Sequence, residues 1–472
     1  MPLDALPPGF ADILGPSGLL TGADMEAYLA DWRGLYRGQA MAVLRPASTE
    51  QVSACVKLCA AQGIRIYPQG GNTSMVGGAT PQDAPRQVIL SLARMNRVLE
   101  VDVADMTMTV EAGLVLAQAQ QVAAAHGALF PLSLGAEGTA MIGGLLSTNA
   151  GGNTTVRYGN ARELMLGLEV VLPDGSVIEG LRRLRKDNTG YALRHLFVGA
   201  EGTLGIITKA VLRLFPAPKE TATALCACPD EDAALALFRR FRAADEGAVR
   251  AFEYMSGIGM DLVLGNIEGV SLPLSARADH YALVDLSASR EGAGLRALME
   301  GVLEAALEAG EVTDAALAES EAQRQAIWKL REEHPEAQKR AGASVKSDVS
   351  VPVSAVPSLI REASAACRAL IPGSRPVPFG HMGDGNIHMN LEQPEGMPAE
   401  EFLARAHDIM DTVNAVVRRL GGSFSAEHGV GRLKTDMLAE WRGGAEYAAM
   451  RAIKAALDPQ GIMNPGVVFP AS

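Results

Sequence analysis

Three glycine-rich segments constrain the fold of this chain more than any other feature of its sequence. They span residues 69–78, 135–152 and 199–208. Glycine-rich loops that follow strands expose consecutive backbone N–H groups, which can hold phosphate oxygens without a side chain in the way. Neither GxGxxG nor GxxxxGK(S/T) occurs, so the pattern supports neither a dinucleotide-binding fingerprint nor a P-loop. Several loops that share one task predict a large extended ligand; tight turns without a ligand are the alternative.

A second concentration of chemistry lies in residues 380–390, which hold two of the eight histidines. From residue 386 onward apolar and polar residues alternate, which predicts a half-buried strand with His388 and Asn390 on one face. His381 lies at odd spacing from His388 and reaches that face only if the intervening glycines redirect the chain. Converging imidazoles suit a divalent metal such as zinc, and Glu427 is the best candidate for a third ligand. The alternative is that the histidines are hydrogen-bonded structural groups.

The charge balance restricts the partners. Lys+Arg 42 against Asp+Glu 54 gives a net charge of −12, which argues against binding to nucleic acid or an anionic membrane. An acidic protein with an anionic substrate must supply local positive charge. The five cysteines form no CxxC pair, which fits a reducing compartment, and we expect a cytoplasmic location. No signal peptide is evident, and no apolar run approaches the roughly 18 to 20 residues of a transmembrane span.

The remaining pattern predicts an α+β chain of two or three domains, with a boundary at Pro216 and Pro218. Ser48 is a plausible N-cap of a helix that ends at Gly63. Other helices are expected at residues 24–35, 115–126, 231–244 and 291–309. Strands are expected at residues 64–67, 87–92, 106–111, 168–172, 176–179, 221–227 and 281–286.

Five segments in order, residues 68–78, 143–152, 199–208, 381–388 and 425–431, resemble the flavoproteins of the vanillyl-alcohol oxidase and p-cresol methylhydroxylase type. Within that family the chain is similar to the D-2-hydroxy acid dehydrogenases, and the resemblance covers almost its whole length. It implies an α+β fold with a two-subdomain FAD-binding domain, a substrate domain with an antiparallel sheet, and a C-terminal helical segment. The corresponding boundaries are 1–36 for an N-terminal cap segment, 37–217 for the FAD-binding domain, 218–425 for the substrate-binding domain, and 426–472 for a C-terminal segment that closes on the flavin.

The resemblance implies that the glycine-rich loops hold FAD, with the pyrophosphate over the first of them. Relatives with covalent flavin often carry a histidine in that loop, where this chain reads Gln69-Gly70-Gly71-Asn72, so we expect noncovalent FAD. The implied FAD contacts are Pro68, Gly70, Gly71, Asn72, Thr73, Ser74, Ser133, Gly138, Thr139, Gly143, Ser147, Asn149, Gly152, Ile207 and Asn464.

The resemblance also implies how a substrate is held. Arg331 and Lys346 match the residues that bind the substrate carboxylate, the first as a bidentate fork and the second as a point charge. Taken alone, Arg331 lies among charged helix residues that are usually solvated. His428 matches the general base, and Asn390 is placed to hydrogen-bond the substrate. One departure concerns Pro335, which stands where D-2-hydroxyglutarate enzymes have a hydroxyl residue, so the substrate's distal group is left open.

Oxidation of a 2-hydroxy acid requires removal of the hydroxyl proton and delivery of the C2 hydride to flavin N5. A divalent metal held by His381, His388 and Glu427, with zinc preferred over manganese or iron, would act as Lewis acid and template. We therefore expect an FAD- and metal-dependent dehydrogenase of D-2-hydroxyglutarate, D-lactate or D-malate. A homodimer is among the expected assemblies. Its electron acceptor would be an electron-transfer flavoprotein or a quinone instead of NAD. The alternatives are a flavin-binding subunit of a glycolate-oxidising complex and a zinc hydrolase; the hydrolase leaves the glycine loops unexplained.

Overall fold

Local sequence signals set the first long helix of the structure, a computed structural model that describes residues 6–470. Helix α2 (Thr49–Gln62) begins at Ser48, whose hydroxyl accepts the N–H of Gln51. It ends at Gly63, which lies in the left-handed region at φ 62°. Residues 1–5, the start of the expected N-terminal cap, and residues 471–472, the end of the expected C-terminal segment, lie outside the described part.

The chain divides into two compact units. The first contains the chain up to Gly151, Gly159–Ala217 and the chain from Glu427 onward. The second contains Gly152–Tyr158 and Pro218–Ala426. Each unit has its own sheets and its own buried core.

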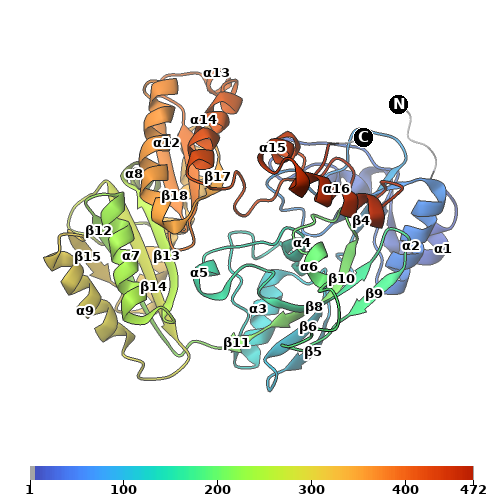
Figure 1. Ribbon diagram of the computed structural model, residues 1–472, viewed down its shortest axis with the longest axis horizontal. Helices are drawn as coiled ribbons and strands as arrows, with labels where there is room; N and C mark the ends of the chain where they lie inside the picture. The colour runs from blue at the N-terminus through green and yellow to red at the C-terminus, as the bar shows by residue number, and fades with distance from the viewer. Residues whose placement is uncertain (1–5, 471–472) are drawn as a thin grey trace. The chain divides into compact units, whose positions relative to one another are not determined.

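The first unit is built on two main sheets (Figure 1). A four-stranded sheet has the order β1 (Leu19–Leu20), β2 (Val43–Leu44), β4 (Gln87–Ser91), β3 (Arg65–Gln69). Its β2–β4 and β3–β4 pairs are parallel. A five-stranded antiparallel sheet has the order β5 (Val98–Asp102), β6 (Thr107–Glu111), β10 (Ile206–Arg213), β8 (Met165–Val171), β9 (Val177–Gly180). The short strands β7 (Ala128–Leu129) and β11 (Phe215–Pro216) form a separate pair.

Helices connect and cover these sheets. Those of the first unit are α1 (Phe10–Leu14), α2, α3 (Leu116–Ala125), α4 (Ile142–Ser147), α6 (Arg194–Phe197), α15 (Thr435–Trp441) and α16 (Ala445–Leu457), with the 3-10 helices η1 (Pro16–Gly18) and η2 (Gly22–Tyr28). The first glycine-rich segment follows β3, the second follows β7 and contains α4, and the third follows α6 and leads into β10. The candidate flavin-binding residues thus lie on connections held by regular elements.

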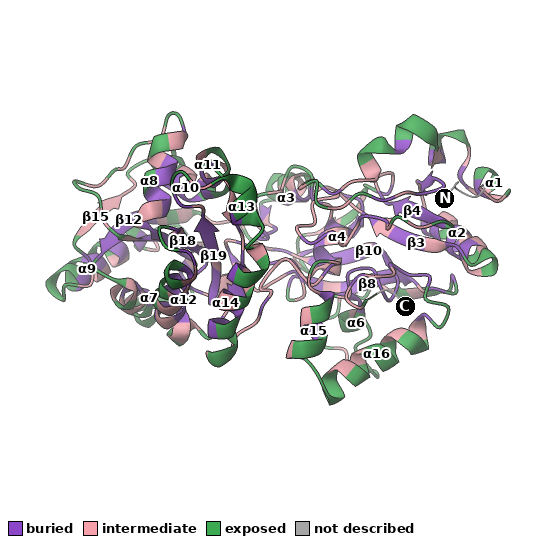
Figure 2. Cartoon of the chain, turned by 90° about the horizontal axis from the view of Figure 1, so that it is seen from above, coloured by how far each residue is buried: buried purple, intermediate pink, exposed green. Residues whose placement is uncertain are grey.

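The second unit is organised around an eight-stranded antiparallel sheet. Its order is β15 (Asp314–Leu317), β12 (Glu220–Cys228), β14 (His280–Ala288), β13 (Val249–Ser256), β18 (Arg375–Gly380), β19 (Asn386–Glu392), β16 (Ser344–Val345), and β17 (Asp348–Ser350) also pairs with β19. Figure 2 shows these central strands as buried and much of the surrounding helix surface as exposed. The antiparallel sheet of the second domain was expected from the family resemblance and is confirmed.

The helices of the second unit are α5 (Thr155–Tyr158), α7 (Glu231–Asp245), α8 (Gly257–Asn266), α9 (Leu295–Glu308), α10 (Glu321–Glu332), α11 (His334–Ala341), α12 (Val356–Leu370), α13 (Ala399–Leu403) and α14 (Ala406–Arg419), with the 3-10 helix η3 (Val353–Ala355). Two groups cover the sheet: α7 packs with α9 and α12, whereas α8 packs with α10 and α11. On β13, Phe252 contacts Phe238 of α7, whereas Ala251 and Met255 belong to the cluster with α8 and α10. Because side chains alternate along a strand, the two groups of helices cover opposite faces.

Two sequence-based expectations about elements are wrong. The helix expected at residues 24–35 is the shorter 3-10 helix η2, after which the Asp31 carboxylate accepts the N–H groups of Arg33 and Tyr36 and closes a turn. The half-buried strand expected from residue 386 is β19, which is buried on both faces, with Asn390 5% exposed and Glu392 fully buried. Helix α12 packs on one face of β19, and Gln338 of α11 reaches Asn390 on the other.

Candidate active site

The two histidines of the 380–390 segment meet because β18 and β19 form a tight hairpin. His381 follows β18 directly, and its carbonyl accepts the N–H groups of Gly385 and Asn386 at 3.1 and 3.2 Å. Gly385 has φ 89°, and a Cβ there would lie 2.1 Å from the Val351 carbonyl oxygen, so only glycine fits. The rings of His381 and His388 lie 5.8 Å apart between centroids in an edge-to-face arrangement. The glycines therefore do redirect the chain so that both imidazoles lie together.

Glu427 completes a set of potential metal ligands. One donor atom each from His381, His388 and Glu427 lies within 4.8 Å of the others. A second group with the same spacing joins Asp348, Glu427 and His428. Glu427 is peptide-bonded to Ala426, the last residue of the second unit, whose N–H donates to the Asp348 carbonyl. Two imidazoles and a carboxylate at this spacing fit a borderline divalent cation such as zinc.

Each of the two imidazoles has a carboxylate behind it. Glu253 Oε1 lies 2.7 Å from Nδ1 of His381, and Asp348 Oδ1 lies 3.6 Å from Nδ1 of His388. Burial raises the pKa of Glu253, but the charges of His381 and Arg331 and the hydrogen bonds from both outweigh it and hold the pKa at about 2. With Nδ1 turned to Glu253, Nε2 is the atom through which His381 would bind a metal, an arrangement common at metal-binding histidines.

Arg331 does not lie on a solvated helix face. It is 6% exposed, and its Nε donates to Glu253 Oε2 at 2.6 Å. Its guanidinium also stacks over the ring of Phe379, 4.9 Å from the centroid. The same ring lies 4.9 Å from the ring of His388. The structure therefore brings the predicted carboxylate-binding arginine and both predicted metal-binding histidines into one cluster.

The segment that contains Lys346 is hydrogen-bonded to Asn390 of β19. Lys346 is half-buried in the connection between β16 and β17, and Asn390 accepts the N–H of the adjacent Ser347 at 3.3 Å. The Asn390 amide also donates to the buried Gln338 at 2.8 Å. Both polar atoms of Asn390 thus bond to the protein, so its predicted contact with substrate would add to these bonds.

The next polar side chain along this face of β19 is Glu392, which is fully buried with neither oxygen hydrogen-bonded. Burial raises the pKa of Glu392 from 4.5 to about 8, and the charges of Arg375 and Lys346 offset only part of this rise. The folded protein therefore keeps a proton that the unfolded chain releases above pH 4.5. Stability should fall as pH rises from the unfolded pKa through the folded one.

Replacing Glu392 by Gln should remove this pH dependence while keeping the side-chain shape. The free energy of unfolding of the wild type, minus that of the variant, is expected to fall by up to about 1.4 kcal/mol per pH unit between pH 5 and 8. Urea denaturation of both proteins at four pH values across this window measures the slope. Glu308→Gln, at an exposed position on α9, is the control and should show no slope. If the difference in free energy of unfolding between the wild type and Glu392→Gln does not change with pH, the pKa of Glu392 is not raised in the folded protein.

The candidate flavin-binding residues of the first unit lie on loops that approach one another closely. A Cβ on Gly71 would lie 2.0 Å from the carbonyl oxygen of Thr139, so the first two glycine-rich loops touch through backbone at this point. Around Gly138 and Gly144, by contrast, a Cβ would meet nothing within 4 Å. Backbone that is open on one side and anchored on the other forms a cradle of the kind that fits an extended phosphate-bearing cofactor.

Asparagines hold the turns of this cradle. Asn72, Asn149 and Asn464 all have positive φ. Asn464 is 2% exposed, and its amide donates to the carbonyls of Gly78 and Glu201 at 2.9 and 2.7 Å. The Oδ1 atoms of Asn72 and Asn464 are buried with no hydrogen-bond partner among the described residues, and a bound ligand is one way to satisfy such atoms.

The other predicted FAD contacts are distributed as follows. Pro68 lies on β3, Gly143 and Ser147 lie on α4, and Ile207 lies on β10. The loops of the first unit contain Gly70, Thr73, Ser74, Ser133, Gly138 and Thr139. Gly152 is the exception, because it belongs to the second unit and its N–H donates to Thr155.

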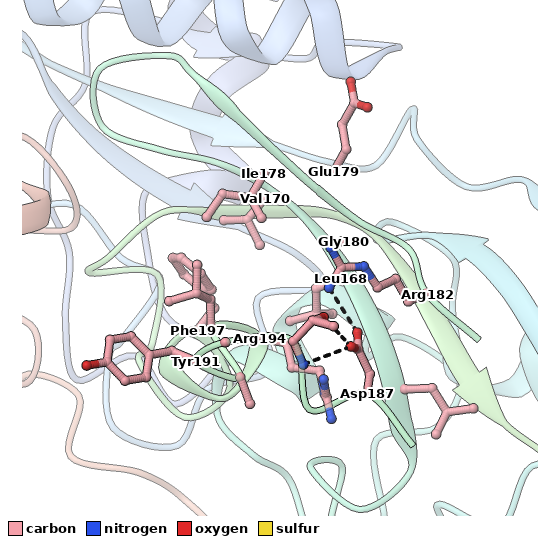
Figure 3. A pocket seen from close by; sticks show the side chains of 15 residues that line it. Leu168, Val170, Ile178, Glu179, Gly180, Arg182, Asp187, Tyr191, Arg194 and Phe197 are labelled. Carbon is pink, nitrogen blue, oxygen red and sulfur yellow. Dashed lines mark hydrogen bonds and ion pairs between the residues drawn. The ribbon is translucent and has the colours of Figure 1, made fainter. Parts of the chain in front are cut away.

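A hollow beside β8 and β9 contains none of these residues (Figure 3). It lies in the first unit between the five-stranded sheet and residues 187–197, and Asp187 bonds to Arg182 and Thr189 along its wall. Tyr191 at its rim is 94% exposed. The hollow therefore plays no part in the candidate site.

Sequence reasoning missed three acidic residues that support the site. Glu253 and Asp348 lie behind the two histidines, and Glu201 accepts the N–H groups of Val430 and Gly431 at 2.7 and 2.8 Å, which fixes the turn after His428. Burial raises the pKa of Glu201 to about 7 against the pull of these N–H groups and Lys434. The available signal was one glutamate inside the apolar run 251–255, a position where an unpaired charge is too costly to persist.

Both parts of the chain are similar to known proteins. Residues 40–180 match the family model of an FAD binding domain, and residues 217–468 match that of FAD linked oxidases, C-terminal domain. A D-2-hydroxyglutarate dehydrogenase of Xanthomonas citri pv. viticola is 36% identical over 95% of this chain and 93% of that protein. A second, from Stutzerimonas stutzeri, is 37% identical over 97% of each. The structure of p-cresol methylhydroxylase with bound substrate superposes with a TM-score of 0.76 at 18% identity, over 98% of this chain and 96% of that one.

The two matched domains define an FAD-linked oxidoreductase, and its fold is that of p-cresol methylhydroxylase. This chain belongs to the FAD-linked oxidase family, and the α+β fold and FAD cofactor expected from the sequence are confirmed. In the described residues no helix combines the length and the apolar character needed to span a membrane.

Proposed function

We propose that this protein oxidises D-2-hydroxyglutarate to its 2-oxo acid with noncovalent FAD and one divalent metal ion, zinc in preference to manganese or iron. The observation that carries the proposal is the convergence of His381, His388 and Glu427 in a chain of this family. The names of its relatives support the substrate. A zinc hydrolase would need the same donors but no flavin-binding domain, so the family leaves that alternative without support.

The chain's own residues would bind and orient the acid. The terminal amino groups of Arg331 and the ammonium of Lys346 would hold carboxylates of the substrate. Arg331 stacks on Phe379, the ring that also lies against His388, and Lys346 precedes the candidate ligand Asp348 by two residues. His428 would accept the hydroxyl proton as general base, because its ring belongs to the donor group with Glu427 and Asp348. When bound, the metal supplies Lewis acidity and the flavin supplies a hydride acceptor.

Electrons would leave the flavin to an electron-transfer flavoprotein or a quinone. A cytoplasmic location is part of the proposal and is supported by five cysteines that are all reduced and buried. Pro335 stands where D-2-hydroxyglutarate enzymes have a hydroxyl residue. The group at the far end of the substrate, away from the 2-hydroxy acid, is therefore what has to be tested. D-2-hydroxyglutarate, D-lactate, D-malate and glycolate should therefore be compared directly.

The test is anaerobic bleaching of the purified yellow protein by each acid, before and after treatment with a chelator. We expect D-2-hydroxyglutarate to bleach the flavin fastest, chelation to abolish the reaction, and added zinc to restore it. Reduction of an artificial dye by the isolated chain would argue against its being only a subunit of a glycolate-oxidising complex. Bleaching by none of the acids would refute the proposed reaction, and full activity after complete metal removal would refute the metal requirement.

A further inference from the structure

The carboxylate of Glu253 has two oxygens, and each accepts from a different functional residue. Oε1 lies 2.7 Å from Nδ1 of His381, and Oε2 lies 2.6 Å from Nε of Arg331. Glu253 lies on β13, which pairs with β18 at Tyr254 and Gly380, the residue before His381. The strand register therefore places the carboxylate directly beneath the histidine that leaves the neighbouring strand.

The surroundings of Glu253 make a purely packing role costly. The side chain is fully buried, and its neighbours on the same face of β13 are Ala251 and Met255, which belong to an apolar cluster with α8 and α10. A buried ion pair is often no more stabilising than apolar residues of the same volume. A carboxylate that persists here, with both oxygens bonded to residues of the candidate site, points to a role in orienting those residues.

We propose that Glu253 is a positioning residue that couples the two halves of the site: one oxygen orients His381 toward the metal, and the other orients Arg331 toward the substrate carboxylate. This inference rests on the proposed function. Because one rigid carboxylate fixes both groups, the distance between the metal and the carboxylate-binding fork is set by Glu253. A 2-hydroxy acid must reach both at once, so this spacing would contribute to substrate selection.

The same sheet face offers a matched control. Asp285 on β14 is also fully buried, and it accepts from Arg324 of α10 at 3.4 Å and from Arg250 at 2.8 Å. Arg324 lies on the same helix as Arg331. Asp285 accepts from Thr223 as well, and its described partners include no histidine. Neutralising Asp285 therefore disturbs a similar buried arginine pair without touching a candidate ligand.

The experiment compares Glu253→Gln with Asp285→Asn. An amide at position 253 has one acceptor oxygen and one NH₂ group, so only one of His381 and Arg331 can still donate to it. Zinc affinity of the chelator-stripped flavoprotein is measured by competition with a zinc-binding dye, without substrate. We expect Glu253→Gln to lose about 10- to 100-fold in zinc affinity and to raise KM for D-2-hydroxyglutarate about tenfold or more. Asp285→Asn should change neither value.

Two results would overturn the inference in distinguishable ways. If wild type and Glu253→Gln bind zinc equally tightly, Glu253 does not position His381, and the proposed function stands. If the wild type binds no zinc, the metal of the proposed function is wrong and the inference fails with it. Glu253→Asp, which keeps the charge but withdraws the carboxylate by one methylene, gives the same readouts if the Gln variant folds poorly. Flavin absorption and circular dichroism verify the fold of each variant.

Discussion

Replacing His388 by Ala is expected to remove the bound metal and to lower kcat/KM about a thousandfold or more. Three protein ligands are the usual number at a catalytic zinc ion, and with His388 gone only His381 and Glu427 of the cluster remain. The flavin-binding loops belong to the first unit, whereas His388 lies on β19 of the second. The variant should therefore keep its yellow colour while losing substrate-dependent bleaching.

Metal content by atomic emission and flavin content by absorption give the two readouts separately. His407→Ala is the matched control, because His407 lies on α14 in the same unit and is exposed. It should keep both metal and activity. A His388→Ala protein that retains one metal ion per chain with wild-type kcat/KM would show that the cluster is not the metal site.

Parts of this site were accessible from sequence because their signals are local. The glycines around Asp384 can be read directly as a turn that redirects the chain, and the structure shows that turn, with Gly385 at a position where a Cβ has no room. Likewise the N-cap at Ser48 and the left-handed Gly63 predict α2 to within a residue at each end. In each case the residues that decide the geometry are neighbours in the chain.

Glu253 shows why the rest was not accessible. It lies 128 positions from His381 and 78 from Arg331, so their hydrogen bonds depend on the order of the strands in an eight-stranded sheet. No periodicity within β13 indicates which strand lies beside it. The family resemblance predicted the candidate ligand His381 and the arginine Arg331. Glu253, which bonds to both, could be identified only once the strand register was known.

The prediction that β19 has one solvated face was wrong for a related reason. Alternation of polar and apolar residues predicts one solvated face, yet Asn386, Asn390 and Glu392 are buried because helices cover both faces of this sheet. A polar residue on such a strand must find a partner, and Asn390 finds Gln338 on α11. Polar residues in a doubly covered strand thus mark either a hydrogen-bonded network, as at Asn390, or a candidate ligand site, as proposed for His388.

Replacing His428 by Asn is expected to lower the rate of flavin reduction by about 10²- to 10⁴-fold, the usual contribution of a general base. Asparagine keeps a polar side chain of similar reach but accepts no proton at neutral pH. Glu427 and the two imidazoles are unchanged, so metal content and FAD content should stay at the wild-type level. KM should change much less than kcat, because the carboxylate-binding residues Arg331 and Lys346 are also unchanged.

Stopped-flow bleaching of two variants distinguishes a base from a merely structural residue. Glu201→Gln is the useful comparison for His428→Asn, because Glu201 fixes the backbone turn at Val430 and Gly431 without being a candidate base. If His428 only shapes that turn, both variants should lose activity to a similar extent. A rate loss confined to His428→Asn, with metal and FAD content unchanged, would assign the proton transfer to this imidazole.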